Sequence, residues 1–260
     1  MPAAPALARI VATYWGFAVN ALPHPDFVHR VWPDGCVTLA FCCTPGRPTI
    51  AVIAGPSVSA TEVHMNAGQH FWGVRFRPEA GGVCCNRSAP SLRDDRMNAS
   101  EVFGERLASV VLALEEMADA EDVTRAGEII DRWLQDTLPD ELPLDTLVSA
   151  AVDLIVADDG TLPIRTVAQR LGVTVRHLQR RFRQATGLSP KEFASVRRGR
   201  AAMKRMLVPQ PRVAGLAQLA AESGYADQSH LSREFSRLTT FTPTVLAARL
   251  DEIAHDRLID

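Results

Sequence analysis

The segments GVTVRHLQRRFRQATGLSPKEF, residues 172–193, and LAAESGYADQSHLSREFSRLTTFTP, residues 219–243, carry the most informative pattern in this chain. They belong to an internal repeat, because the seven residues from Val167 align with the seven from Leu219 at an offset of 52. Each copy is interpreted as helix, turn, helix, since one glycine in each copy permits a tight backbone turn. The repeat therefore predicts two helix-turn-helix units, at about residues 164–186 and 215–239.

The residue types at the crossing and cap positions fit this interpretation. Ala168 and Ala220 are small at the point where the two helices of a unit would cross. Thr174 and Asp227 carry side-chain oxygens that can accept hydrogen bonds from the free N–H groups at the start of a helix. The second helix of each unit is therefore expected to begin just after its threonine or aspartate.

A longer helix is predicted to join the two units. Ser189 and Glu192 form a capping box with Pro190 at the first helical position, so a helix is expected from about residue 190 to 207. Gly199 lies in its middle, where glycine costs up to about 1 kcal/mol relative to alanine. We therefore expect this helix to be soft at Gly199, and Gly199→Ala to raise the thermal stability.

The second helix of each unit has an apolar face and a polar face. Arginine, glutamine, serine and histidine occupy the polar face, and such side chains hydrogen-bond base edges and phosphates in a DNA groove. A solvated helix face would explain any single arginine, but it does not explain the same arrangement twice. The predicted DNA-contacting residues are Arg176, His177, Gln179, Arg180, Arg183, Gln228, Ser229, His230, Ser232 and Arg233.

Charge is divided unevenly along the chain, although the net charge of all 260 residues is only −2. Residues 161–249 hold 16 basic and four acidic residues, which leaves +12, whereas residues 1–150 carry −8. So basic a segment favours a polyanionic partner. The length exceeds that of one ordinary domain, and we place the boundary within 138–143, giving an N-terminal domain over 1–142 and a DNA-binding domain over 143–260.

The N-terminal half is predicted to be rich in β-structure. Short apolar runs between residues 34 and 78 are separated by glycine and proline, which is typical of a small barrel or sandwich. In residues 71–76 large apolar side chains alternate with Gly73 and Arg75, which predicts a half-buried strand with one basic face. Helical periodicity follows from about residue 102 to 134, and these helices are expected to bridge the two domains.

In the two segments quoted first, the sequence resembles the AraC/XylS family of transcription regulators. The resemblance covers about residues 144–250, and it implies seven helices in which Arg176, Gln179 and Arg180, and in the second unit Gln228, Ser229, His230 and Arg233, face DNA. Gly199 departs from the family pattern, where leucine is usual. Residues 32–41 (WPDGCVTLAF) and 73–78 (GVRFRP) are similar to the small β-barrel sensor-like domain of some members, which implies an effector pocket.

The five cysteines support an alternative hypothesis, a thiol- or metal-responsive sensor that switches the same DNA-binding domain. Cys42 and Cys43 are adjacent, as are Cys84 and Cys85, and histidines of the same half could add metal ligands. Adjacent residues of a strand point to opposite faces, so each pair is expected to offer one inward thiol at most. We therefore expect buried free thiols, with no metal site and no cofactor. A zinc-dependent alkyltransferase is disfavoured, because the spacing does not suggest four clustered thiolates.

The sequence thus predicts an α+β protein: a small cupin-like β-barrel domain with accompanying helices, then an all-α domain with two helix-turn-helix units. Its predicted function is that of a sequence-specific, cytoplasmic transcription regulator of the AraC/XylS type that reads two adjacent major grooves. Double-stranded DNA is the expected partner. RNA polymerase, a second copy of the chain and an unidentified small-molecule effector are candidate partners, and no membrane is expected. No motif suggests catalytic residues, so an enzyme is not expected.

Overall fold

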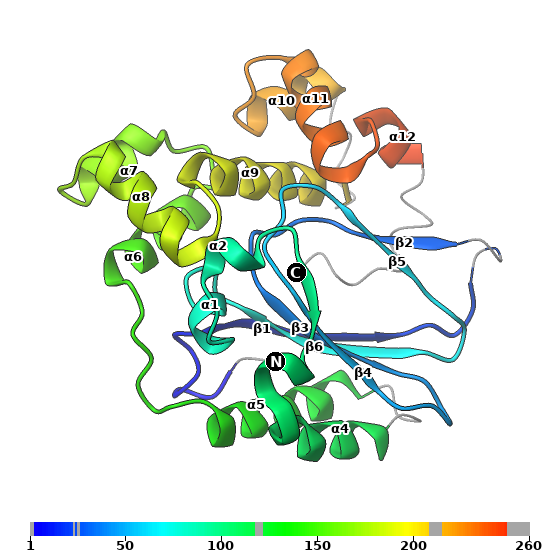
Figure 1. Ribbon diagram of the computed structural model, residues 1–260. Coiled ribbons are helices and arrows are strands. Elements are labelled where there is room, and N and C mark those ends of the chain that lie inside the picture. Colours follow the sequence, from blue (N-terminus) through cyan, green and yellow to red (C-terminus); the bar gives the residue numbers. More distant parts are fainter. Residues whose placement is uncertain (1–2, 23, 25–26, 118–121, 208–214, 249–260) are drawn as a thin grey trace.

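The computed structural model describes residues 3–22, 24, 27–117, 122–207 and 215–248. Its N-terminal half contains two antiparallel sheets (Figure 1). The larger sheet has the strand order β1 (Val11–Ala18), β6 (His70–Phe76), β3 (Thr38–Cys43), β4 (Ile50–Ala54) and β7 (Arg96–Asn98). The smaller sheet pairs β2 (Val28–Val31) with β5 (Thr61–His64).

The strand β6 lies inside the larger sheet, between β1 and β3. Six of its seven residues are buried, so the predicted half-buried strand with a basic face is wrong. Arg75 is buried because its guanidinium forms an ion pair with Asp34, from the loop between β2 and β3. Alternation in sequence could not show that a carboxylate from a distant loop would cover the basic side of this strand.

Helices α4 (Leu107–Glu115) and α5 (Val123–Thr137) pack on the larger sheet and share its core. Tyr14 on β1 donates a 2.5 Å hydrogen bond to Asp131 on α5, which ties this helix to the edge strand of the sheet. The expectation that these helices bridge two domains is wrong, because their apolar faces are buried against the sheet. Three one-turn helices complete this half: α1 (Gly81–Cys84), α2 (Ala89–Leu92) and α3 (Ser100–Phe103), the last followed by a 3₁₀ turn, Gly104–Arg106.

The C-terminal half is helical, which confirms the predicted α+β class. Within the described residues it has seven helices: α6 (Thr146–Ala157), α7 (Ile164–Arg170), α8 (Val175–Thr186), α9 (Pro190–Leu207), α10 (Leu216–Glu222), α11 (Gln228–Thr239) and α12 (Pro243–Ala248). Two small cores hold them together, one around Leu178 and Phe182 and one around Leu231 and Phe235. None of the helices in the described ranges is long and apolar enough to cross a membrane.

The joining helix α9 begins at the capping box that the sequence predicts. The backbone N–H of Ser189 donates to Glu192 Oε2 at 2.7 Å, and the N–H of Glu192 donates to Ser189 Oγ at 3.2 Å. Glu192 also accepts a 2.8 Å hydrogen bond from Arg93, which follows α2 in the N-terminal half. Burial alone would raise the pKa of Glu192, but the hydrogen bonds from Arg93 and Ser189 outweigh it and hold this pKa at about 2.

Helix α9 and the turn that precedes it also contact the N-terminal half through close approaches (Figure 1). A Cβ atom added to Gly35 would lie 2.6 Å from the ring of Phe193, near the start of α9. A Cβ atom on Gly187 would lie 2.6 Å from the carbonyl oxygen of Ala89 on α2. Both glycines have positive φ angles, 78° and 76°, so each serves a turn and a contact at once. The two halves therefore pack directly against each other.

Gly199 has a packing role that the sequence analysis did not foresee. It is buried on α9, and an added Cβ atom would lie 2.1 Å from Leu238 Cδ1 on α11. Leu238 is itself 1% exposed, so its side chain has little room to move away. The expectation that Gly199→Ala raises the stability is therefore contradicted, since the helix-propensity gain is outweighed by the cost of overpacking a core.

We expect Gly199→Ala to lower the free energy of unfolding by about 1 kcal/mol, because overpacking costs about 1–3 kcal/mol against a propensity gain of up to about 1. Combining it with Leu238→Val should cost less than the sum of the two single changes, since the smaller side chain makes room for the new methyl group. Urea unfolding of the four proteins measures this coupling. If the two changes in unfolding free energy simply add, or if the Gly199→Ala protein is more stable than the wild type, the contact between Gly199 and Leu238 is not tight.

The Glu192 carboxylate should contribute a pH-dependent stability. Because its folded pKa is held at about 2, below the ordinary value of 4.5, its contribution is present above pH 4.5 and lost as the pH falls toward 2. Glu192→Gln should therefore be less stable than the wild type at neutral pH, with a difference that shrinks over this range. Urea unfolding at several pH values tests this, with exposed Glu128→Gln as control. A pH-independent difference would contradict it.

Candidate nucleic-acid interface

The second helix of the first unit, α8, is set in place by its cap and by its apolar face. Thr174 Oγ1 accepts a 3.2 Å hydrogen bond from the backbone N–H of His177, as the sequence predicts. Gly172 supplies the turn before it with a φ angle of 68°. Leu178 and Phe182 are completely buried, so rotation of the helix about its axis is fixed by the core below it.

The second unit repeats this construction. Asp227 Oδ1 accepts a 2.7 Å hydrogen bond from the N–H of His230 at the start of α11, and Gly224 turns the chain with a φ angle of 71°. Leu231 and Phe235 are completely buried. The His230 ring meets the ring of Tyr225 edge-on, with centroids 5.3 Å apart, which holds this histidine at the edge of the helix.

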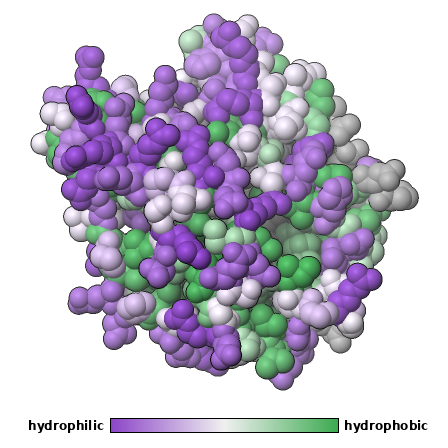
Figure 2. All heavy atoms as spheres, viewed as in Figure 1, coloured by the Kyte–Doolittle hydropathy of each residue, from purple (hydrophilic) through white to green (hydrophobic). Residues whose placement is uncertain are grey.

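The structure distributes the ten predicted DNA-contacting residues over the outer faces of α8 and α11. His177, Ser232 and His230 are half-buried. The other seven are exposed: Arg176, Gln179, Arg180, Arg183, Gln228, Ser229 and Arg233. Figure 2 shows hydrophilic side chains gathered at the upper left, where Figure 1 places α7 and α8. The predicted residues therefore form two separate polar faces, one on each helix.

Acidic residues near these helices are engaged elsewhere. Asp145 accepts a 2.6 Å hydrogen bond from Arg181 Nε, and Glu234 binds Arg237 and Ser195. By contrast, none of the four exposed arginines of the two faces, Arg176, Arg180, Arg183 and Arg233, has an ion-pair partner among the residues that the structure describes. The two faces thus keep their positive charge available for an outside partner.

Helix α9 connects the two faces through the cores beneath them. Phe193 and Ala194, near its start, belong to the core of the first unit, and Ala202 and Met203 belong to the core of the second. Figure 1 shows α8 toward one end of α9 and α11 toward the other. The spacing of the two faces is therefore set by one helix.

The remaining side of α8 faces the N-terminal half, which the sequence pattern does not predict. Arg181, Gln184 and Ala185 line a cavity together with residues of α1, α2 and their flanking loops. Likewise, Arg237 on α11 donates a 3.0 Å hydrogen bond to the carbonyl oxygen of Val58. No local pattern could have revealed these roles, because the partner residues are about 100 positions or more away in the sequence.

All five cysteines are free, and burial raises the pKa of each of them, to about 11 at Cys43 and about 12 at Cys85. On β3, Cys43 is buried and Cys42 half-buried, in line with opposite faces of a strand. Cys84 and Cys85 are both buried because they end a short helix, so the expectation of one inward thiol is wrong for this pair. No group of three or more metal-ligating side chains occurs within the described parts of the chain.

Comparisons with known proteins address the two halves separately. Residues 167–249 match the family model of a helix-turn-helix domain. Residues 1–98 match a domain of unknown function, DUF6597. The search of curated proteins found no match. The C-terminal part of the chain thus contains an AraC-type helix-turn-helix domain, a DNA-binding domain of transcription regulators, and the match of the N-terminal part assigns it no function.

Solved structures show distant similarity. One is a transcriptional regulator with an AraC-type DNA-binding domain from Chromobacterium violaceum, with 23% identity over 40% of this chain and 91% of that chain, and a TM-score of 0.36. ToxT from Vibrio cholerae O395 has 11% identity over 91% of this chain and 96% of that chain, with a TM-score of 0.45. Wild-type ToxT from strain SCE256 with bound unsaturated fatty acid has 10% identity, over 91% and 95%, with a TM-score of 0.43.

The cysteine environment predicts slow thiol chemistry. A thiol must lose its proton to react, and burial raises the pKa of each cysteine, so Ellman's reagent at pH 8 should modify the native protein far more slowly than the protein in guanidinium chloride. Half-buried Cys42 is expected to react first. Spectrophotometric thiol counting checks this. A cysteine that reacts in the native protein as fast as in the unfolded one would instead favour a thiol sensor.

Proposed function

We propose that this protein is a sequence-specific transcription regulator that reads two adjacent major grooves of double-stranded DNA with α8 and α11. One observation carries the proposal: two capped helices, built alike and joined by α9, each present exposed arginine and glutamine side chains. The four arginines on these faces have no ion-pair partner within the described residues. A neutral or basic partner would leave these charges uncompensated, whereas DNA supplies phosphates and base acceptors.

The joining helix supports simultaneous contact with both grooves. It has 18 residues and, at 1.5 Å per residue, spans about 27 Å. Successive major grooves on one side of DNA lie about 34 Å apart. Because each recognition helix adds its own offset from the axis of α9, this length is of the right order for adjacent grooves.

Within each face we assign roles by side-chain chemistry. Arg180 and Arg233 would read guanine through paired hydrogen bonds, and Gln179 and Gln228 would read adenine. Arg176 and Arg183, together with the serines and histidines at the helix edges, would bind phosphates. These roles make different predictions, because a lost base contact changes preference at one position, whereas a lost phosphate contact weakens all sequences alike.

The N-terminal domain would act as the regulatory domain, because it touches the DNA-binding half at α8, α9 and α11. RNA polymerase and a second copy of the chain remain candidate partners for such a regulator. The alternative function, a thiol- or metal-responsive sensor, has less support, because the cysteines are buried with raised pKa values. No observation favours it over a response to a small molecule.

Base reading can be tested by selecting binding sites for the wild-type protein from a random DNA library, then measuring variants on the selected site and its point changes. Arg180→Ala and Arg233→Ala should each cost about 1–3 kcal/mol and relax preference at one position, a different one for each variant. Arg132→Ala, an exposed change on α5, is the matched control and should bind normally. Equal weakening on every sequence would make both residues phosphate contacts.

A further inference from the structure

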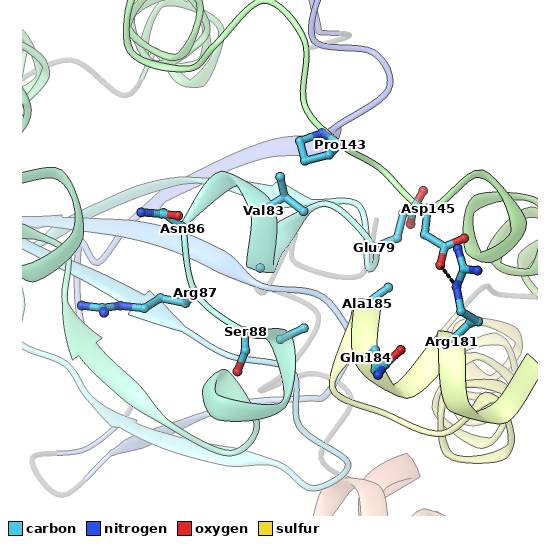
Figure 3. A pocket seen from close by; sticks show the side chains of 12 residues that line it. Glu79, Val83, Asn86, Arg87, Ser88, Pro143, Asp145, Arg181, Gln184 and Ala185 are labelled. Atoms are coloured by element: carbon cyan, nitrogen blue, oxygen red, sulfur yellow. Dashed lines mark hydrogen bonds and ion pairs between the residues drawn. The ribbon is translucent and has the colours of Figure 1, made fainter.

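A cavity of about 450 Å³ lies between the N-terminal half and the first helix-turn-helix unit (Figure 3). Glu79, Val83 and Asn86 from around α1 line one part of it, and Arg181, Gln184 and Ala185 of α8 line another. Its volume falls within the range of about 300–1,000 Å³ that is usual for small-molecule sites. The lining combines polar and apolar surface in similar amounts, so a ligand there would be held by apolar contact and by directed hydrogen bonds.

Glu79 is the unusual group of this cavity. Its side chain has 0% exposure, and one carboxylate oxygen, Oε1, accepts a 2.9 Å hydrogen bond from Arg77 Nε. The other oxygen, Oε2, has no hydrogen-bond partner among the described residues. A buried carboxylate oxygen without a partner costs free energy, so this atom is an acceptor that a ligand could satisfy.

The charges around Glu79 are incompletely balanced. Arg77 is shared, because it also donates a 2.6 Å hydrogen bond to Asp153 on α6. Asp145, the other carboxylate that lines the cavity, is already satisfied by the N–H groups of Leu147 and Val148 and by Arg181. The carboxylates of Glu79, Asp145 and Asp153 thus share only the guanidinium groups of Arg77 and Arg181. This leaves an excess of one negative charge in the group.

Arg87 is the remaining charged residue of the lining. It belongs to the opposite wall, and in Figure 3 its guanidinium group points away from Glu79. Its NH2 group lies 3.5 Å from the carbonyl oxygen of Glu101. It therefore does not compensate the unpaired carboxylate oxygen of Glu79.

We propose that this cavity binds a small organic cation with N–H donors, an alkylammonium or guanidinium compound, through Glu79 Oε2. The cation would supply both the missing hydrogen bond and the missing positive charge. Asn86 and Gln184, whose side chains line the same cavity, offer further amide oxygens to a second donor of the ligand. Burial of the Glu79 carboxylate favours this pairing, because charge-assisted hydrogen bonds are strong away from water.

The position of the cavity suggests regulation, an aspect that rests on the proposed function. Arg181 is on the same helix as Arg176 and Arg180 but on the side that faces the N-terminal half, and Gln184 lies one turn beyond Arg180 at the rim of the cavity. A ligand between them and Glu79 would join the N-terminal half to the first recognition helix. Any effect of the ligand on DNA affinity must then be matched by an equal effect of DNA on ligand affinity.

Isothermal titration calorimetry of the full chain without DNA tests the site itself. The probes are agmatine, 1,4-diaminobutane and benzamidine, compared with neutral 1,4-butanediol and anionic succinate. We expect at least one cation to bind with one-to-one stoichiometry and a Kd below about 1 mM, and neither comparison compound to do so. If none of the three cations binds, or if butanediol or succinate binds equally well, the proposal is wrong.

Two variants locate the binding. Glu79→Gln keeps an oxygen for Arg77 but removes the charge, and it should weaken cation binding at least tenfold. Gln184→Trp leaves Glu79 and Arg77 unchanged but fills part of the cavity, and it should do the same. Glu128→Gln, an exposed change on α5, should bind as the wild type does. Wild-type affinity in either folded cavity variant would overturn the assignment. Since no DNA is present, failure here is separate from failure of DNA reading.

Discussion

Burial of the joining helix α9 is the constraint on which the rest of the structure depends. Phe193 near its start is completely buried beside Phe182, and Ala202 further along is completely buried in the core of the second unit. Gly199 lies between them, and because it has no side chain, Leu238 of α11 packs directly against the backbone of α9. One helix thus supplies the cores of both units, so neither recognition helix can turn without disturbing the packing of α9. The same helix meets the N-terminal half through Phe193 and Gly35, which connects that half to the spacing of the two faces.

In the C-terminal half, charged groups that face neighbouring elements are paired, whereas the arginines on the outer faces of α8 and α11 are not paired within the described residues. Carboxylates are engaged toward the interior: Glu192 with Arg93, Asp145 with Arg181, and Glu234 with Arg237. The outer faces of α8 and α11 keep arginines without such partners in the described structure. A protein that must bind phosphates benefits from this division, because each internal ion pair removes an acidic group that would otherwise repel DNA. Glu79, which lines the cavity between the two halves, has one carboxylate oxygen without a hydrogen-bond partner among the described residues.

Much of the second half could be predicted from sequence, because its signals are local. Thr174 and Asp227 cap helices whose free N–H groups lie within three residues, and the buried leucine and phenylalanine of each unit recur at helical spacing. Predictions failed where a distant element decided the outcome. Arg75 is buried because Asp34 reaches it, and the glycine of α9 is tightly packed because Leu238 lies against it. The strands β1 and β2 were not predicted, since their apolar residues show weak alternation and their partners, β6 and β5, follow 30 or more residues later.

The sequence by itself determined the two helix-turn-helix units, the capped starts of their second helices, the length of the helix between them and the basic character of that half. These features depend on interactions within a few residues or on composition, and both can be read along the chain. Only the tertiary structure decided that α4 and α5 cover the sheet, that α8 turns its other side toward α1 and α2, and that a cavity lined in part by the buried Glu79 lies between them. Such features arise where surfaces far apart in sequence meet, and their free energy depends on shape and charge that exist only after folding.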